Sequence, residues 1–190
     1  MLLEFDFKSS LRRLIPPHIQ NPTERLDQLL QRKDALEAGI ISPSDFISWA
    51  LSLLGSDATE VQFKQAWRQI FTVNKAMWQC VNKLKERGHR LILFSNINAI
   101  HCPWIFITYP EFSNFEQAVL SFETGFIKPQ PEIYQFAIAS HGLKPADTLY
   151  IDDMAENIVV GKAFGFQCWQ YDINEHQAFE AWLSDKLSSS

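Results

Sequence analysis

Three short motifs place groups that can handle phosphate directly after apolar residues: 93–96 (LFSN), 125–129 (GFIKP) and 150–153 (YIDD). Ser95 supplies a hydroxyl, Lys128 supplies a cation held by the following proline, and Asp152 and Asp153 supply a pair of carboxylates. Adjacent carboxylates repel each other unless a lysine or a metal ion neutralises them. These residue types therefore suit a site for phosphate and Mg²⁺ that neutralises charge during phosphoryl transfer.

Each motif alone has an ordinary structural explanation. Ser95 and Asn96 are common helix-capping types, and Lys128 would be unremarkable as a surface lysine in a turn. The joint order is more informative, because the intervals between Ser95, Lys128 and Asp152 each hold about one strand and one helix. The three residues are therefore expected at one edge of a parallel sheet, where open α/β folds bind ligands.

A sheet of this kind is predicted from residue 74 onward, where helical and strand patterns alternate. Strands are expected at residues 90–94, 117–121, 148–151 and 167–171, with helices before Gly88, at 132–140, at 155–164 and around Trp182. Strands separated by helices form parallel sheets with right-handed crossovers. The predicted fold class is α/β, a Rossmann-like parallel sheet with helices on both faces, in a core of residues 1–14 and 78–190.

Residues 15–77 are predicted to form a small all-α cap inserted near the N-terminus. Capping signals bound three helices: one from Asn21 to Gly39, one from Ser42 to Gly55, and one from Ser56 or Asp57 onward. The third has an unusually wide apolar face, which is typical of a helix that packs against several neighbours. The cap is therefore expected to have its own buried centre.

The composition restricts the class of partner. The chain of 190 residues has a net charge of −5 without long runs of one sign, so it offers no basic stripe to nucleic acid or to a membrane. No apolar run reaches the ~18 residues that span a bilayer, and the start lacks a signal-peptide pattern. Cys80, Cys102 and Cys168 lie far apart without metal-ligand spacing, as free thiols do in a reducing compartment. We therefore expect a cytoplasmic protein.

With these motifs in this order, the chain resembles the haloacid dehalogenase (HAD) superfamily of hydrolases. The likeness is greatest to the small α-capped, phosphatase-like branch that includes the N-terminal domain of soluble epoxide hydrolase, and its most specific stretches are residues 93–96, 125–134 and 151–157. The resemblance implies a Mg²⁺-dependent phosphatase that acts on small phosphomonoesters through an aspartyl-phosphate intermediate. It also implies a small phosphorylated metabolite as partner and a monomer or homodimer.

On the phosphate side, the resemblance gives roles to Ser95, Asn96 and Lys128. Ser95 hydrogen-bonds the transferring phosphoryl oxygens, with help from the backbone around Asn96. Lys128 neutralises the charge of the nucleophile and of the phosphate. Phosphoryl transfer depends mainly on charge neutralisation and positioning, so these roles agree with the chemistry of the residues.

On the metal side, the resemblance gives roles to Asp153, Asp152 and Asn157. Asp153 is a direct Mg²⁺ ligand, and Asp152 contacts the lysine or a metal-bound water. Asn157 supports these carboxylates from behind. The cofactor implied is therefore Mg²⁺, held mainly by the carboxylate pair.

The first motif of the family, an apolar strand that ends in a nucleophilic aspartate, is not found at its expected place. Residues 1–7 (MLLEFDF) resemble the segment that comes just after that motif in the family, which places the nucleophile a few residues upstream of Met1. A rival alignment makes Asp6 the nucleophile. Glu4 argues against it, because a central parallel strand buried on both faces should be continuously apolar.

Motif order also separates other phosphate-handling classes. A response-regulator receiver uses similar groups, but there the acidic residues come first. A dinucleotide-binding site is excluded because residues 161–165 (GKAFG) lie at the end of a helix and not at a strand-to-helix turn. The alternative that stays open is a catalytically inactive relative that binds a ligand or a partner.

The physiological substrate is not set by these motifs. Its determinants are expected on the cap helices at 15–73 and in residues 101–115, because a cap closes over the leaving group. Trp104, Phe106 and Tyr109 are interpreted as packing between cap and core in preference to a pocket lining. His101 is interpreted as a loop or cap contact in preference to an acid–base group.

Overall fold

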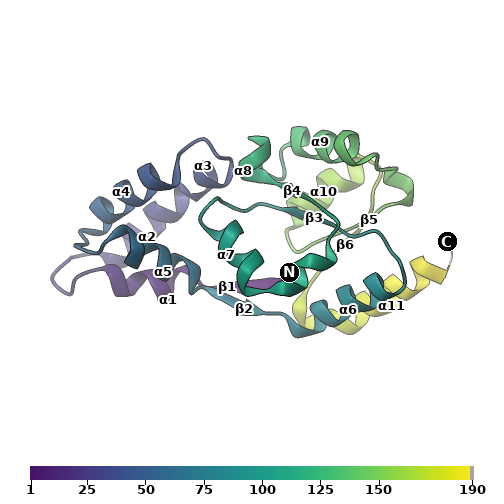
Figure 1. Cartoon of the computed structure of the whole chain (residues 1–190), viewed down its shortest axis with the longest axis horizontal. Coiled ribbons are helices and arrows are strands. Elements are labelled where there is room, and N and C mark those ends of the chain that lie inside the picture. Colours follow the sequence, from purple (N-terminus) through teal and green to yellow (C-terminus); the bar gives the residue numbers. More distant parts are fainter. Residues whose placement is uncertain (189–190) are drawn as a thin grey trace.

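The computed structural model describes residues 1–188, in which a helical cap and an α/β core lie end to end (Figure 1). The core contains α6 (Lys75–Glu86), β3 (Ile92–Ser95), α7 (His101–Thr108), η2 (Pro110–Asn114), β4 (Gln117–Leu120), α8 (Ser121–Thr124), α9 (Pro131–His141), η3 (Pro145–Asp147), β5 (Leu149–Asp152), α10 (Ala155–Ala163), β6 (Gln167–Gln170), η4 (Ile173–Glu175) and α11 (His176–Ser188). The cap contains α1 (Phe7–Leu11), η1 (Arg12–Leu14), α2 (Pro22–Gln31), α3 (Lys33–Glu37), α4 (Pro43–Leu54) and α5 (Glu60–Arg68). Two short strands, β1 (Leu3–Phe5) and β2 (Phe71–Val73), join the parts. Within residues 1–188, none of the helices is long and apolar enough to cross a membrane.

The core strands form two parallel pairs, β3 with β4 and β5 with β6. This confirms the predicted α/β class, and the separation of the two pairs agrees with the absence of the family's first strand from its expected place in the sequence. Within residues 1–188, no backbone ladder joins the two pairs. β3 and β5 nevertheless face each other, since the Phe94 ring lies against the Tyr150 ring with centroids 5.7 Å apart. The structure therefore has two facing, unpaired strand edges, called here the β3–β5 edges.

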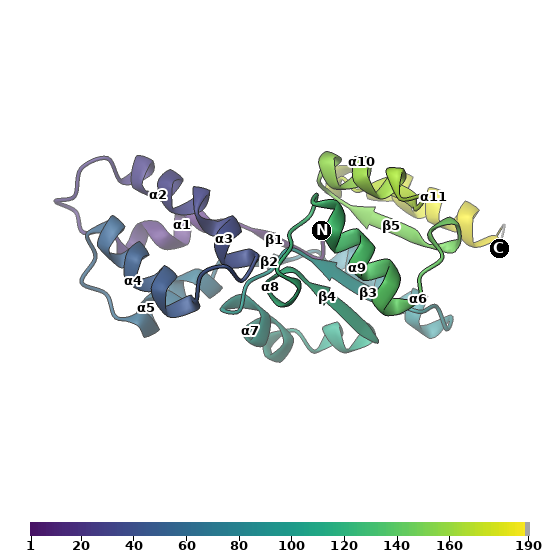
Figure 2. The ribbon, with the colours of Figure 1, turned by 90° about the horizontal axis from the view of Figure 1, so that it is seen from above.

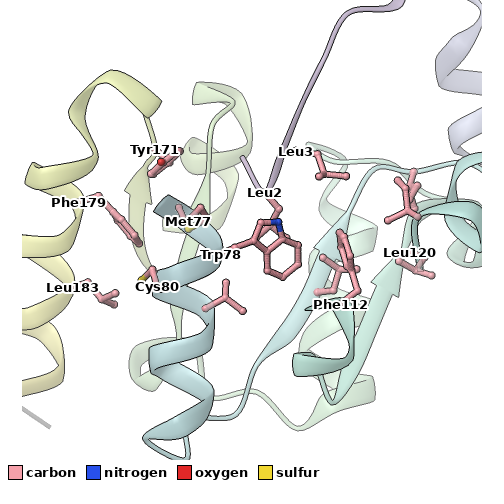
Figure 3. Close-up of a cluster of buried hydrophobic side chains, with 14 residues drawn as sticks. Leu2, Leu3, Met77, Trp78, Cys80, Phe112, Leu120, Tyr171, Phe179 and Leu183 are labelled. Carbon is pink, nitrogen blue, oxygen red and sulfur yellow. The ribbon is translucent and has the colours of Figure 1, made fainter. Parts of the chain in front are cut away.

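Helices cover both faces of the strand pairs, as predicted. One hydrophobic cluster includes Trp78 of α6 and Phe179 of α11, and another includes Tyr134 of α9. Leu2 and Leu3 lie in the first cluster (Figure 3). The apolar start of the chain is therefore used for packing against α6.

The cap buries its own cluster of apolar side chains from α1, α2, α4 and α5, including Phe46 and Trp67. Leu11 of α1 is fully buried in this cluster. The cap core therefore begins upstream of residue 15, where the sequence interpretation begins the cap. The sequence interpretation assigns residues 1–14 to the core. In the structure, however, the helix α1 within that stretch packs against the cap helix α5.

One cap helix has the predicted ends, and another does not. In α4, the Ser42 side chain accepts a hydrogen bond from the backbone N–H of Asp45, and Gly55 has the left-handed conformation typical of a helix end. The third helix begins at Glu60 and not at Ser56 or Asp57. Its start is set by a capping box, in which Thr59 and Gln62 satisfy each other's backbone N–H groups.

The helix predicted from Asn21 to Gly39 is divided into α2 and α3 near Arg32. Asn21 does not act as a side-chain cap, because its backbone has φ 54° and its side chain makes no capping hydrogen bond. Pro22 starts α2 without needing a partner for an N–H group.

β1 and β2 pair antiparallel, with Leu3 opposite Val73, and form a ribbon between cap and core (Figure 2). Asp6, which follows β1, caps α1, where its carboxylate accepts a hydrogen bond from the N–H of Ser9 at 3.1 Å. A nucleophile would have to end a strand of the parallel sheet, whereas β1 pairs with β2. The structure therefore gives Asp6 the role of a helix cap.

His101, at the start of α7, is buried against the cap. Its ring stacks on Trp67 of α5 with centroids 5.4 Å apart, and its edge meets the Phe71 ring at 4.8 Å. Nε2–H donates to the Trp67 carbonyl at 2.7 Å, because a carbonyl only accepts, so Nδ1 accepts from the side-chain amide of Asn98. Trp104 stacks on Phe71. His101 therefore packs the core against the cap, whereas Trp104 packs on β2, one of the two strands that join core and cap.

We expect His101 to make the protein less stable as the pH falls from 6.5 to 4. The pKa of His101 is lowered from 6.5 to about 4, mainly by burial and in smaller part by the charges of Arg68 and Lys33, while the hydrogen bond to Trp67 acts in the opposite direction. The unfolded chain therefore binds a proton that the folded chain rejects, which removes about 3 kcal/mol across this window. Urea unfolding at pH 6.5 and pH 4 measures the loss.

The matched variants for this experiment are His101→Gln and His18→Gln, since His18 is exposed. The His101 variant should show a smaller loss of stability between the two pH values, whatever its stability at pH 6.5. The His18 variant should keep the loss of the natural sequence. Equal losses in all three proteins would contradict the assignment to His101.

Gly39→Ala should weaken the contact between α3 and α8. Gly39 has φ +67°, and a Cβ atom there would lie 2.4 Å from the Phe122 carbonyl oxygen, which is backbone and cannot rotate away. The substitution should cost more than about 2 kcal/mol in urea unfolding. Gly88→Ala is the control, because Gly88 has φ +80° but no atom within 4 Å of the added Cβ. A cost no larger than that of the control would argue against close cap–core contact here.

Candidate active site

A buried ion pair joins the second and third sequence motifs. The Lys128 ammonium lies 2.6 Å from Oδ2 of Asp152, and the two residues are 8% and 4% exposed. The ammonium also donates to the Phe94 carbonyl at 2.9 Å and lies over the Phe94 ring. Within residues 1–188, it contacts no other hydrogen-bond acceptor. Since an ammonium has three N–H groups, one is left for a ligand.

Asp152 is held by donors on both carboxylate oxygens. Oδ2 also accepts from the Tyr150 hydroxyl at 2.8 Å, and Oδ1 accepts from the Met154 N–H and the Asn157 side chain, both at 2.9 Å. Burial raises the pKa of Asp152, but Lys128 and the hydrogen bonds from Met154 and Asn157 outweigh it and hold the pKa below its usual range. Asp152 is thus placed as the partner of Lys128, one of the two contacts that the resemblance implies for it.

Asn96 has a role in the structure that its sequence position does not reveal. Its side chain donates to the Lys128 carbonyl at 2.9 Å and accepts from the Lys128 N–H at 2.8 Å. The two-point contact fixes the backbone of the lysine loop against the end of β3. Ser95 is half-buried beside it, and the next turn is fixed where Ser121 accepts from the Ile97 N–H at 2.9 Å. Ser95, Asn96 and Lys128 are therefore brought to one edge.

Asp153 is the exposed member of the carboxylate pair. Its Oδ2 lies 3.4 Å from the ammonium of Met1, which places the first described residue beside the end of β5. Mg²⁺ in proteins prefers oxygen ligands, and it often binds one or two carboxylates while keeping several waters. Within residues 1–188, no cluster of three or more His, Cys, Asp or Glu forms a closed metal cage. An exposed carboxylate next to Asp152 fits the open, hydrated coordination of Mg²⁺.

Two tyrosines belong to the site although the sequence motifs did not single them out as site residues. Tyr150 donates to Asp152, and Tyr134 donates to the carbonyl of Asn157 at 3.0 Å. A signal for Tyr150 was available, because residues two apart on a strand point to the same face. No short-range pattern indicates Tyr134, which reaches the site from α9 through the fold.

The comparisons with known proteins agree with this arrangement. Residues 22–165 match the family model of haloacid dehalogenase-like hydrolases. The chain is 29% identical over 181 residues to D-ribitol-5-phosphate phosphatase of Bacteroides thetaiotaomicron, which covers 90% of this chain and 86% of that protein. It is 25% identical over 134 residues to a sesquiterpene phosphatase of Aspergillus oryzae, which covers 70% of this chain and 68% of that protein.

Solved structures show the same fold. A HAD family enzyme of Bacteroides thetaiotaomicron superposes with a TM-score of 0.78 at 25% identity, over 92% of this chain and 90% of that one. The same enzyme has been solved with magnesium and inorganic phosphate, also as an aspartate-to-alanine variant. A predicted HAD-like family hydrolase of Porphyromonas gingivalis superposes with a TM-score of 0.76 at 26% identity, over 96% and 92% of the two chains. The chain described here therefore belongs to the haloacid dehalogenase-like hydrolases.

Proposed function

We propose that this chain forms the site of a Mg²⁺-dependent phosphatase that acts on small phosphomonoesters through an aspartyl-phosphate intermediate. The observation that carries the proposal is the buried Lys128–Asp152 pair, which keeps one ammonium N–H free beside Ser95 and Asn96. The ammonium would neutralise charge on the transferring phosphoryl group, and a buried position strengthens that effect. The Ser95 hydroxyl and the backbone near Asn96 would bind the phosphoryl oxygens.

Asp153 is the proposed Mg²⁺ ligand, and the ion would shield the negative charge of the phosphoryl oxygens. Asp152 positions Lys128, and Asn157 positions Asp152 through a hydrogen bond of 2.9 Å. The magnesium and phosphate complexes of the Bacteroides enzyme support this assignment. Asp152 has its oxygens occupied by protein donors, so we assign the metal contact chiefly to Asp153.

The nucleophilic aspartate is proposed to lie on a strand between the β3–β5 edges, a few residues upstream of Met1. Such a strand would run parallel to β3 and β5, and its carboxyl end would reach the edge where Asp153 and Met1 lie 3.4 Å apart. The second candidate function is an inactive, phosphate-binding protein. It is favoured by the position of Asp6, which caps a helix and does not end a parallel strand.

A small phosphorylated metabolite is the proposed partner, in a monomer or homodimer. The relative that is a ribitol-5-phosphate phosphatase supports this substrate class. We also propose a reducing compartment, the cytoplasm, and the free state of Cys80, Cys102 and Cys168 supports it.

The test uses the chain extended upstream by an apolar strand that ends in aspartate. We expect Mg²⁺-dependent hydrolysis of p-nitrophenyl phosphate, abolished by EDTA and by Asp153→Asn, and reduced roughly 10²-fold or more by Lys128→Ala. Lys162→Ala, on the exposed side of α10, is the control and should keep full activity. Activity that survives EDTA and both site substitutions would exclude the proposed function.

The 190-residue chain itself is expected to turn over little substrate but to bind phosphate in the presence of Mg²⁺. If the chain turned over substrate rapidly and Asp6→Asn abolished the activity, Asp6 would be the nucleophile. The proposed position of the nucleophile would then be wrong.

A further inference from the structure

The cap carries a partly buried ion pair that the proposed mechanism does not use. The Lys33 ammonium lies 2.7 Å from Oε2 of Glu37, one turn further along α3, and the two side chains are 24% and 9% exposed. A pair at this spacing usually lies on a solvated helix face and contributes little. Here the Glu37 carboxylate is largely removed from water, which is costly for a pair that only connects one helix turn to the next.

The pair lies where the cap meets the core. α3 approaches α8 so closely that Gly39, two residues after Glu37, leaves no room for a Cβ atom against the Phe122 carbonyl. α8 leads directly into the loop that carries Lys128, and α3 lies beside α8 in both views (Figure 2). α3 is therefore the cap helix that faces the lysine loop.

Electrostatics connect the pair to the site from two directions. Burial raises the pKa of Glu37, and the charges of Lys33 and Lys128 act against this effect. The charge of Lys33 in turn contributes to the low pKa of His101 at the start of α7. Glu37 therefore lies within electrostatic range of Lys128 in the lysine loop, and Lys33 lies within range of His101, which follows shortly after Ser95 and Asn96 in the chain.

The pair has unused hydrogen-bonding capacity. Within residues 1–188, Oε1 of Glu37 accepts no hydrogen bond, while Lys33 also reaches Asp34 at 3.1 Å. A carboxylate oxygen accepts from a hydroxyl, and an ammonium donates to one, so together they match both functions of an alcohol group. An apolar ligand over the same pair would remove water from these charged groups and would offer no hydrogen bond in return.

We propose that Lys33 and Glu37 form a leaving-group subsite that selects phosphate esters whose leaving group carries hydroxyl groups, such as polyol or sugar phosphates. The inference rests on the proposed function, because it assigns the cap side of that same site. Phosphate would bind between Lys128 and Ser95, and the hydroxyl-bearing chain would extend toward α3. Sites built to hydrogen-bond a hydroxyl discriminate strongly against analogues that lack it.

The test is isothermal titration calorimetry of the 190-residue chain with Mg²⁺ and three probes: inorganic phosphate, D-ribitol 5-phosphate and n-pentyl phosphate. The last two share a five-carbon chain and differ in hydroxyl groups. We expect ribitol 5-phosphate to bind at least about tenfold more tightly than pentyl phosphate. One or two charge-assisted hydrogen bonds from its hydroxyl groups to Lys33 and Glu37 account for a difference of this size. Binding of inorganic phosphate reports on the phosphate site alone.

The double variant Lys33→Met/Glu37→Leu removes both charges, which avoids leaving one of them buried without its partner. It should lose the preference for ribitol 5-phosphate and keep the affinity for inorganic phosphate. The single variant Glu37→Gln should reduce the preference. The control is Glu60→Gln/Lys64→Met, which removes a second pair of the same spacing, 2.5 Å apart and more exposed on α5. It should keep the preference.

The outcomes separate this inference from the proposed function. If the natural sequence does not bind inorganic phosphate, the proposed function fails and the inference fails with it. If phosphate binds but ribitol 5-phosphate binds no more tightly than pentyl phosphate, only the inference is overturned. A preference that persists in the double variant likewise overturns it, because the selectivity then comes from other residues.

Discussion

Adding an apolar strand of ~10–15 residues ahead of Met1 should raise the melting temperature by well over 10 °C. Within residues 1–188, no ladder joins the β3–β5 edges, so most of the backbone groups along them lack a strand partner. A strand placed there would form two ladders and bury several apolar side chains, which is worth well over ~5 kcal/mol. In a domain of this size, each kcal/mol shifts the midpoint by roughly 2–4 °C.

The comparison is between thermal unfolding of the 190-residue chain and that of the extended chain. An extension of equal length with a proline at its centre is the control, because proline cannot donate to a ladder. The shorter chain should also aggregate more readily, since unpaired edges recruit strands from other molecules. Sharp and equal transitions in the two chains would show that residues 1–188 already complete the core.

Lys128→Met should destabilise the protein by about 3–5 kcal/mol, because Asp152 would stay buried without its cation. The pair is 2.6 Å apart, and its side chains are 7% and 5% exposed. Lys85→Met is the control, since Lys85 pairs with Glu116 at 2.9 Å on the surface and should cost less than about 1 kcal/mol. Urea unfolding at pH 7 compares the variants.

The double variant Lys128→Met/Asp152→Asn removes both charges and should recover much of the loss. The asparagine at position 152 keeps one side-chain oxygen, which can still accept hydrogen bonds from the Met154 N–H and the Asn157 side chain. If Lys128→Met costs no more than Lys85→Met, the pair is not buried in solution. That result would also remove the observation on which the proposed function rests.

The helices and strands were predictable where local chemistry decides them. Ser42 and Gly55 specify the ends of α4 because a side-chain cap and a left-handed residue act within one turn. The start of α5 was missed, although Thr59 and Gln62 have the spacing of a capping box, because Ser56 and Asp57 offered nearer capping types. Several residues near a helix start can therefore act as the cap. The one that has a Glu or Gln three residues later, as Thr59 has in Gln62, forms the capping box.

The candidate site was predictable in its members and less so in their contacts. Motif order brought Ser95, Lys128 and Asp152 to one edge, because strand ends in a parallel sheet meet there. The side-chain contact of Asn96 with the Lys128 backbone, at 2.8 and 2.9 Å, depends on how two loops approach each other. Periodicity carries no information on such contacts between distant loops. The same holds for the burial of Glu37, which no periodicity in α3 indicates.

The ribbon of β1 and β2 has a mechanical consequence for the cap. Both linkers between cap and core are hydrogen-bonded to each other, from Asp6 N–H with the Ile70 carbonyl to Asn74 N–H with the Leu2 carbonyl. Sliding one linker along the other would break all of these bonds at once, whereas bending or twisting the ribbon keeps them. The two linkers therefore act as one hinge with a fixed axis. Access to Lys128 would then depend on the angle of the cap and not on its translation.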